Sequence, residues 1–322
     1  VLSLSNTYKQ LGIAHELVLT SDRTTKRFDE KFESYDFLEH YLIYFPEIDL
    51  FLDPTEIYYR LGLIPAKYTA NNGLFIKEVS AAGIVTGVGK IKNIPAPSRE
   101  KCFDKLRLNV KFSSDLLSNS MTMRKENFGY YANSYQPYFE ILSDDVKKEV
   151  QEEIVKYISK NIEIVSMQFE NANSEFIARK PLIANAEITS TEFIQKAGNK
   201  ILFKVGDLIG PQAEMYNVEK RVLPVENDFN RTYYRVLTIE IPEGYKIENL
   251  QDIIINKSVV ESDGSISSKF TSNYTLQGNI LTITVDEWYN QIYYPIEKFE
   301  DYRAVINAAA DFNKVVFVLV GK

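Results

Sequence analysis

The strongest constraint on the fold is an alternation of apolar and polar residues that recurs after residue 100. In the segment KLRLNVKFS (105–113) every second residue is apolar, and most of the others are charged or polar. A period of two places these sets on opposite faces of a β-strand, one buried and one solvated. Similar short segments with turn residues between them recur at 186–195, 201–205, 233–241, 253–261, 267–276 and 280–285. This spacing is typical of an antiparallel β-sandwich.

A few segments have helical periodicity instead. Residues 1–12 indicate a helix that ends at Gly12. A second helix is predicted after Ser143, because Asp144 and Asp145 favour the positive end of the helix dipole. A third is predicted at 298–312, before a buried strand at 315–320. Helices near 130–160 and 298–312 would therefore be inserted into a β-rich region.

Composition excludes several classes of function. Asp and Glu number 44 against 37 Lys and Arg, giving a net charge of −7, so a nucleic-acid partner is not expected. The longest apolar run, 315–320, is far shorter than the roughly 20 residues that cross a bilayer, so no membrane span is predicted. With one cysteine and two histidines, an intrachain disulfide, a cysteine-based zinc site and a multi-histidine metal site are excluded, and neither a cofactor nor a metal is expected.

A predicted hairpin in the N-terminal part carries the main candidate site, His40 and Asp53. His40 lies on the first strand (37–45), and Asp53 ends the second (50–53). A carboxylate beside a histidine can hold the imidazole in one tautomer while it acts as a base. With the turn centred between residues 47 and 48, Asp53 lies one diagonal step from His40 on the same face. With the turn centred instead between residues 46 and 47, the two face each other directly, whereas a register slipped by one residue puts them on opposite faces. We expect hydrogen-bond contact.

The N-terminal segments resemble a known enzyme family. The order LGIAHELVLTSDR, FLEHYLIYF and FLDPT, followed by GLIP and GLFI, is similar to the latter part of the transglutaminase-like, papain-related cysteine enzyme core. In that family a cysteine at a helix start is the nucleophile, a strand histidine is the base, and an aspartate on the neighbouring strand orients it. His40 and Asp53 match the histidine and the aspartate. The C-terminal segments YYRVLTIEIPEGYKIENL and NILTITV resemble a β-rich domain of unknown function that follows such cores in bacterial envelope proteins.

The resemblance implies a fold class and a domain organisation. The class is α+β: the second half of a transglutaminase-like core, followed by a β-sandwich-type region with inserted helices. The expected domains are the core at 1–90, a β-rich middle domain at 91–230 and a C-terminal β-rich domain at 231–322. A Gly-, Ala- and Pro-rich stretch at 81–98 is interpreted as the first domain boundary. A periplasmic or secreted location follows from the resemblance.

The implied function is amide hydrolysis or acyl transfer on a peptide or protein substrate. The family nucleophile belongs at the start of the first helix, upstream of Val1, so we expect a fragment that is inactive alone. Cys102 follows Asp53 in the chain and shares parity with the buried face of the next strand, which favours a structural role. Ser3 and Ser5 would need a base poised against them to replace it. The alternative function is a non-catalytic binding or scaffolding module whose β region engages a protein or glycan partner.

Overall fold

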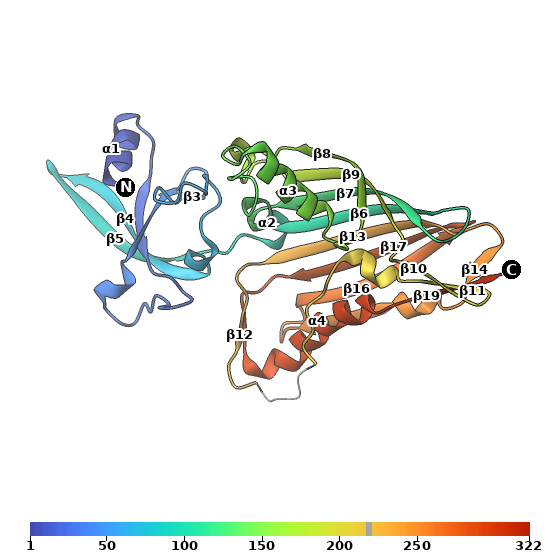
Figure 1. Cartoon of the computed structure of the whole chain (residues 1–322). Coiled ribbons are helices and arrows are strands. Elements are labelled where there is room, and N and C mark those ends of the chain that lie inside the picture. Colours follow the sequence, from blue (N-terminus) through green and yellow to red (C-terminus); the bar gives the residue numbers. More distant parts are fainter. Residues whose placement is uncertain (217–220) are drawn as a thin grey trace.

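The computed structural model describes residues 1–216 and 221–322, which form two units (Figure 1). An N-terminal unit is built on a five-stranded sheet, and a larger unit is built on an eight-stranded sheet. The units are joined by the segment 95–102, which contains the short 3₁₀ helix η3. Within the described residues, no helix has the length and apolar character that crossing a membrane requires.

The N-terminal unit begins with a helix and continues as antiparallel strands. The order in its sheet is β3-β2-β1-β4-β5. Its main elements are α1 (Leu2–Gln10), β1 (Glu16–Thr20), β2 (His40–Phe45), β3 (Leu50–Leu52), β4 (Asn71–Ala81) and β5 (Ile84–Ile94). Gly12, with φ +70°, follows the end of α1 as predicted, because a left-handed residue there lets the chain turn away. Val18, Leu42 and Phe75 form part of a small core under this sheet.

The larger unit is organised around one sheet of the order β15-β16-β17-β13-β6-β7-β9-β8. Its strands are β6 (Phe103–Phe112), β7 (Asn119–Phe128), β8 (Glu163–Glu170), β9 (Leu182–Ser190), β13 (Arg231–Glu240), β15 (Ile255–Val260), β16 (Ile266–Gln277) and β17 (Ile280–Tyr289). Strands β6 and β13 pair in parallel in the middle of the sheet, with Leu106 opposite Arg235, and the other pairs are antiparallel.

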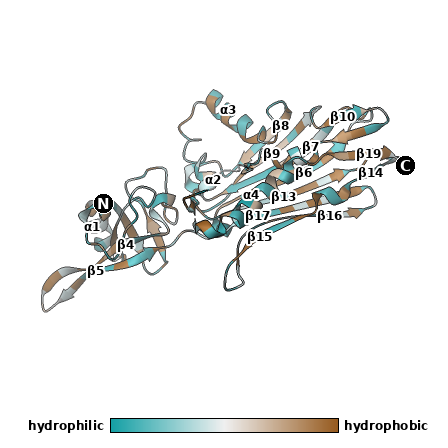
Figure 2. Cartoon of the chain, turned by 90° about the horizontal axis from the view of Figure 1, so that it is seen from below, coloured by the Kyte–Doolittle hydropathy of each residue, from teal (hydrophilic) through white to brown (hydrophobic). Residues whose placement is uncertain are grey.

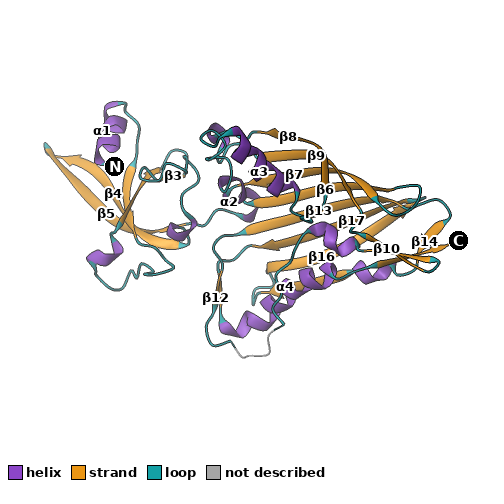
Figure 3. Ribbon diagram, in the orientation of Figure 1, coloured by secondary structure: helices purple, strands orange, loops and turns teal. Residues whose placement is uncertain are grey.

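One face of this sheet is covered, and the covering elements are mainly helices. They include α3 (Asp144–Val155), α4 (Phe299–Asn313) and a four-stranded sheet of β10 (Ile194–Ala197), β11 (Lys200–Phe203), β14 (Tyr245–Ile247) and β19 (Phe317–Gly321). Figure 3 shows α3 and α4 lying along the large sheet. Leu108 and Leu237 of the sheet pack with Val155 of α3 and Val305 of α4 in one core. The opposite face carries residues such as Arg107 and Thr122 and is open to solvent.

The remaining elements are short. They are α2 (Tyr130–Asn133), the strand pair β12 (Val225–Glu226) and β18 (Tyr293–Tyr294), and the 3₁₀ helices η1 (Tyr35–Phe37), η2 (Ala66–Tyr68), η3 (Arg99–Lys101), η4 (Ser174–Phe176), η5 (Val205–Ile209), η6 (Leu250–Ile253) and η7 (Ile296–Lys298). The predicted helices after Ser143 and at 298–312 are confirmed as α3 and α4.

The predicted fold class, α+β with a β-sandwich-type region, is wrong. The described residues are mostly β, with 42% strand and 20% helix, and they form several sheets. The strand alternation was interpreted as two facing sheets. In the structure, however, eight of the strands lie side by side, and helices and a smaller sheet supply most of the second layer. Alternating apolar and polar residues indicate which face of a strand is buried, but they do not indicate whether helices or a second sheet cover that face.

The segment 81–98, interpreted from its composition as the first domain boundary, is a strand over most of its length. Most of it is β5, an edge strand that pairs with β4 along its length in a long hairpin. Figure 2 shows this hairpin projecting from the N-terminal unit, and near its tip Ile84 and Val85 are exposed. The domain limits at 90 and 230 stay predictions. Strands from both sides of residue 230 nevertheless share the eight-stranded sheet.

Candidate functional site

The hairpin of β2 and β3 places His40 and Asp53 on the same face. Ile43 pairs with Leu52, and Phe45 pairs with Leu50. The turn is therefore centred between residues 47 and 48, and continuing this register puts Asp53 across from Leu42, one diagonal step from His40. This is the first of the three registers considered from the sequence.

The predicted direct contact between His40 and Asp53 is nevertheless not made. Among the described residues, neither a hydrogen bond nor an ion pair joins these two side chains. Tyr68 of η2 takes the position beside the imidazole: its hydroxyl lies 2.9 Å from Nδ1 of His40, and the ring centroids are 4.5 Å apart. A diagonal pair is separated by about 7–8 Å between backbones, which leaves room for a third side chain.

Asp53 is buried and held by its own loop. Asp53 is only 3% exposed. Its Oδ1 accepts hydrogen bonds from the backbone N–H of Thr55 at 2.9 Å and from the Thr55 hydroxyl at 2.7 Å. Burial raises the pKa of Tyr68. The positive charge of Lys67 opposes this rise, and the negative charge of Asp53 adds to it. Asp53 thus contributes to the raised pKa of Tyr68, the residue that contacts His40.

Cys102 lies outside this group of residues. It is fully buried just before β6, in a cluster that includes Leu63, Tyr130 and Ile177. Burial raises the pKa of its thiol to about 11. The buried parity predicted for Cys102 is confirmed, and such a thiol is a poor nucleophile near neutral pH.

A contact that the sequence reasoning missed joins Ser5 and His15. The hydroxyl of Ser5 lies 2.6 Å from Nε2 of His15, and the other ring nitrogen, Nδ1, lies 2.9 Å from the carbonyl oxygen of Ile13. Because a carbonyl only accepts, Nδ1 carries the proton and Ser5 donates to Nε2. The contact ties α1 to the residues just before β1. Ser3 is exposed on α1.

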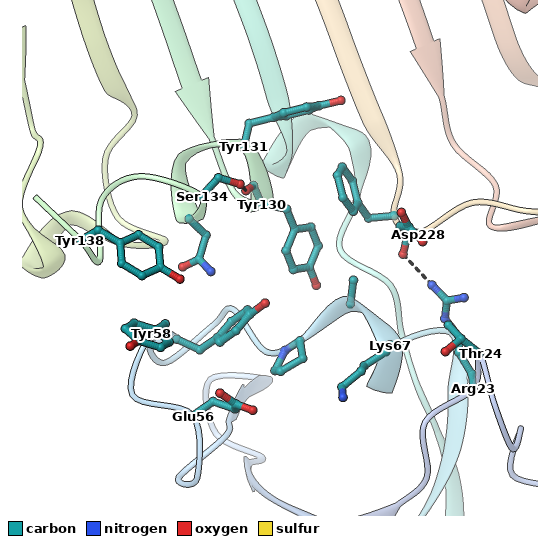
Figure 4. Close-up of a pocket in the computed structure, with 15 residues that line it drawn as sticks. Arg23, Thr24, Glu56, Tyr58, Lys67, Tyr130, Tyr131, Ser134, Tyr138 and Asp228 are labelled. Carbon is teal, nitrogen blue, oxygen red and sulfur yellow. Dashed lines mark hydrogen bonds between the residues drawn. The ribbon is translucent and has the colours of Figure 1, made fainter. Parts of the chain in front are cut away.

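A pocket of about 650 Å³ lies beside the loop that follows Asp53. Glu56, Tyr58 and Tyr59 of the N-terminal unit line one side, and Tyr130 and Tyr138 of the larger unit line the other. Figure 4 shows Glu56 and Tyr58 facing Tyr130 and Tyr138 across this pocket.

Across residues 1–216 and 221–322, no group of three or more His, Cys, Asp or Glu side chains has an arrangement that could hold a metal ion.

Comparison with known proteins places only the C-terminal region. Residues 193–319 match the model of the family DUF3858, described as a domain of unknown function with a solved structure. The coarser part of the expected resemblance, a domain of unknown function in the C-terminal part, is thereby confirmed. No curated protein matches the chain.

One similar solved structure is the crystal structure of a "putative protease" from Parabacteroides distasonis ATCC 8503. It is 11% identical in sequence and has a TM-score of 0.40. The alignment covers 97% of this chain and 41% of that one, so the chain spans about two fifths of the length of the protein it resembles.

Proposed function

We propose that the N-terminal unit holds the acid–base half of an acyl-transfer site of the transglutaminase-like cysteine hydrolase type. His40 is the base. Tyr68 holds its ring, and Asp53 supplies the negative charge behind Tyr68. The reaction is hydrolysis or transfer at an amide of a peptide or protein, in a bacterial periplasmic or secreted protein.

The observation that carries this proposal is the contact of Tyr68 with only one of the two ring nitrogens of His40. The hydrogen bond engages Nδ1. Among the described residues, no group is hydrogen-bonded to Nε2. When Nδ1–H donates to the hydroxyl oxygen of Tyr68, Nε2 keeps its lone pair and can accept a proton from a nucleophile. The imidazolium formed in this way would lie one diagonal step from the buried carboxylate of Asp53.

The nucleophile must come from elsewhere. The chain's one cysteine, Cys102, is buried in a different cluster. A thiol attacking the amide carbonyl would therefore be contributed by residues outside these 322. The chain alone is expected to show no amide hydrolysis above background, because removing the nucleophile leaves only residual catalysis.

A second candidate function is a binding or scaffolding module. It is favoured by the open polar face of the large sheet, where β6, β7, β8 and β9 line a shallow groove of about 750 Å³. The groove residues are Arg107, Asn109, Thr122, Met123, Arg124, Ser166, Met167, Gln168, Asn185, Ala186 and Glu187. The arginine, glutamate and amide side chains of this groove would bind a polar partner, which is a protein or a glycan of the cell envelope.

The experiment measures hydrolysis of p-nitrophenyl acetate, an activated ester that needs no enzyme thiol. The chain has two histidines, so His15→Gln is a matched control for His40→Gln. His40→Gln should remove most of the protein-dependent rate, and Asp53→Asn should lower it several-fold. His15→Gln should retain the rate; a fall would instead assign the rate to the Ser5–His15 pair, whose hydroxyl oxygen and Nε2 lie 2.6 Å apart.

Two results oppose the acid–base proposal. One is an unchanged rate in His40→Gln. The other is a rate that falls in His15→Gln and persists in His40→Gln. Either would remove His40 as the base and leave the binding module as the better account.

A further inference from the structure

The pocket between the two units has the composition of a binding site and is independent of His40. Its walls come from the 56–67 segment of the N-terminal unit, from the 130–138 segment of the larger unit, and from Asp228 and Phe229. A volume of about 650 Å³ is within the usual range of small-molecule sites.

Direct hydrogen bonds between the two units fix the positions of the pocket walls. The Tyr130 hydroxyl donates to the carbonyl oxygen of Ile64 at 2.9 Å. The Arg23 guanidinium donates to the carbonyl oxygens of Asn227 at 3.2 Å and Asp228 at 2.5 Å, the latter drawn in Figure 4. Because these contacts hold the two walls together, a ligand would enter a preformed site and lose less free energy to ordering.

Several hydrogen-bond donors in the pocket walls are already engaged by the protein, whereas the hydroxyls of Tyr58, Tyr59, Tyr131 and Tyr138 make no hydrogen bond with the described residues. Arg23 donates to main-chain carbonyls and to Glu226, and the hydroxyl of Thr24 donates to Asp22. Tyr130 is occupied as described, and the Ser134 hydroxyl donates to the Tyr130 carbonyl at 3.3 Å. Lys67 lies 3.5 Å from Asp22 in an ion pair.

Several acceptors in the walls are free as well. Asn133 is 9% exposed, and its Oδ1 is buried without a hydrogen-bond partner among the described residues. The carboxylates of Glu56 and Asp228, also wall residues, have neither a hydrogen bond nor an ion pair within the part of the chain that is described. A buried acceptor without a donor costs free energy, so Asn133 is suited to an O–H or N–H from outside.

Aromatic rings supply the apolar part of the surface. Tyr58 and Tyr138 meet across the opening with ring centroids 5.0 Å apart, and Tyr130 packs on Phe229 at 4.8 Å. Tyr138 is 36% exposed. Aromatic faces carry partial negative charge and attract the C–H groups of an apolar ligand face.

We propose that this pocket binds a neutral oligosaccharide. Sugar hydroxyls both donate and accept, so they can pair with the free carboxylates and with the free tyrosine hydroxyls of the walls, while the C–H faces of the sugar ring stack on the tyrosines. A peptide backbone brings only one donor and one acceptor per residue, fewer than the hydroxyls of a sugar residue. The unpaired Glu56 and Asp228 disfavour an acidic ligand.

The test is calorimetric titration of the 322-residue chain with maltotetraose, cellotetraose and chitotetraose, with tetra-alanine as the competing class. At least one tetrasaccharide should bind one to one. Asn133→Ala and Tyr138→Ala should each weaken that binding by about tenfold or more. Tyr35→Ala, at a tyrosine 92% exposed outside the pocket, should leave it unchanged. His40→Gln should bind like the wild type, which separates this site from the acid–base proposal.

Asn133→Ala also guards against a purely structural explanation. Because Oδ1 makes no hydrogen bond with the described residues, its removal should not lower the free energy of unfolding. The proposal is overturned if no tetrasaccharide binds at about 10 mM, if tetra-alanine binds and the saccharides do not, or if Asn133→Ala and Tyr138→Ala both bind like Tyr35→Ala.

Discussion

Asp104→Asn tests whether a charged cluster buried under the large sheet stabilises the fold. Asp104 lies on the covered face of β6, with its Oδ2 2.6 Å from Nζ of Lys125 and its Oδ1 2.7 Å from the guanidinium of Arg235. Asn127 donates a further hydrogen bond to Oδ2 at 3.0 Å. The side chains of Asp104, Lys125 and Arg235 are at most 8% exposed, so solvent screens these charges weakly.

The expected loss in the free energy of unfolding depends on the buried charges of Lys125 and Arg235 that Asp104→Asn leaves without a partner. Burial alone would raise the pKa of Asp104, yet Arg235 and Lys125 hold it at about 2. A difference of nearly two units from the ordinary 3.8 corresponds to about 2 kcal/mol. Removing one partner of a buried ion pair costs roughly 3–5 kcal/mol, because the other charge stays buried. Burial lowers the pKa of Lys125, so this ammonium can lose its proton and limit the cost. We expect a loss of about 3 kcal/mol.

The pH dependence has a defined sign. The pKa of Asp104 is lower in the folded protein than in the unfolded chain, so its ionisation stabilises the fold above about pH 4. That contribution is lost as the pH falls through about 2, where the folded carboxyl takes up its proton. The amide that Asp104→Asn introduces cannot titrate, so the difference between wild type and variant should shrink over this interval.

Urea unfolding followed by the fluorescence of Trp288, the single tryptophan, measures these differences. Glu248→Gln is the matched control, since its ion pair with Lys200 at 3.1 Å is half exposed and should be worth less than about 1 kcal/mol. An Asp104→Asn variant within about 1 kcal/mol of wild type at neutral pH would refute the stabilising role of the cluster.

Two further predictions concern single residues. Cys102 should react with a thiol reagent slowly in the native protein and rapidly after denaturation, because burial raises its pKa to about 11; immediate labelling of native protein near neutral pH would contradict this. Gly129→Ala should destabilise the protein by more than the roughly 1–2 kcal/mol of a left-handed alanine, because its Cβ would lie 2.2 Å from the carbonyl oxygen of Lys101. Gly12→Ala, with a similar φ and open space around it, is the control in thermal unfolding, and equal losses in both would refute the clash.

Local patterns predicted much of the fold. The hairpin of β2 and β3, helices α3 and α4, and the burial of Cys102 follow from periodicity and turn residues that act over a few positions. Strand β5 was missed because its glycines resemble a linker. The signal was the pair Ala82 and Gly83, whose φ angles of 51° and 80° make the tight turn between β4 and β5.

Long-range pairing was beyond local reasoning. Strands β6 and β13 lie side by side although they are far apart in the sequence, and only the assembled sheet shows that they share it. The candidate site likewise depends on a contact between segments that are distant in the sequence. His40 and Asp53 could be placed on one face from the hairpin alone, whereas Tyr68 reaches the imidazole from a separate 3₁₀ helix that no short pattern links to it.

The most direct test of the proposed acid–base role is the tautomer of His40, read from the ring ¹⁵N chemical shifts near neutral pH. His15→Gln leaves one histidine and so assigns the signals. The account predicts a protonated Nδ1, hydrogen-bonded to Tyr68, and an unprotonated Nε2; Tyr68→Phe should disturb this state. A neutral ring with its proton on Nε2 would contradict it, because that nitrogen could not then accept a proton from a nucleophile.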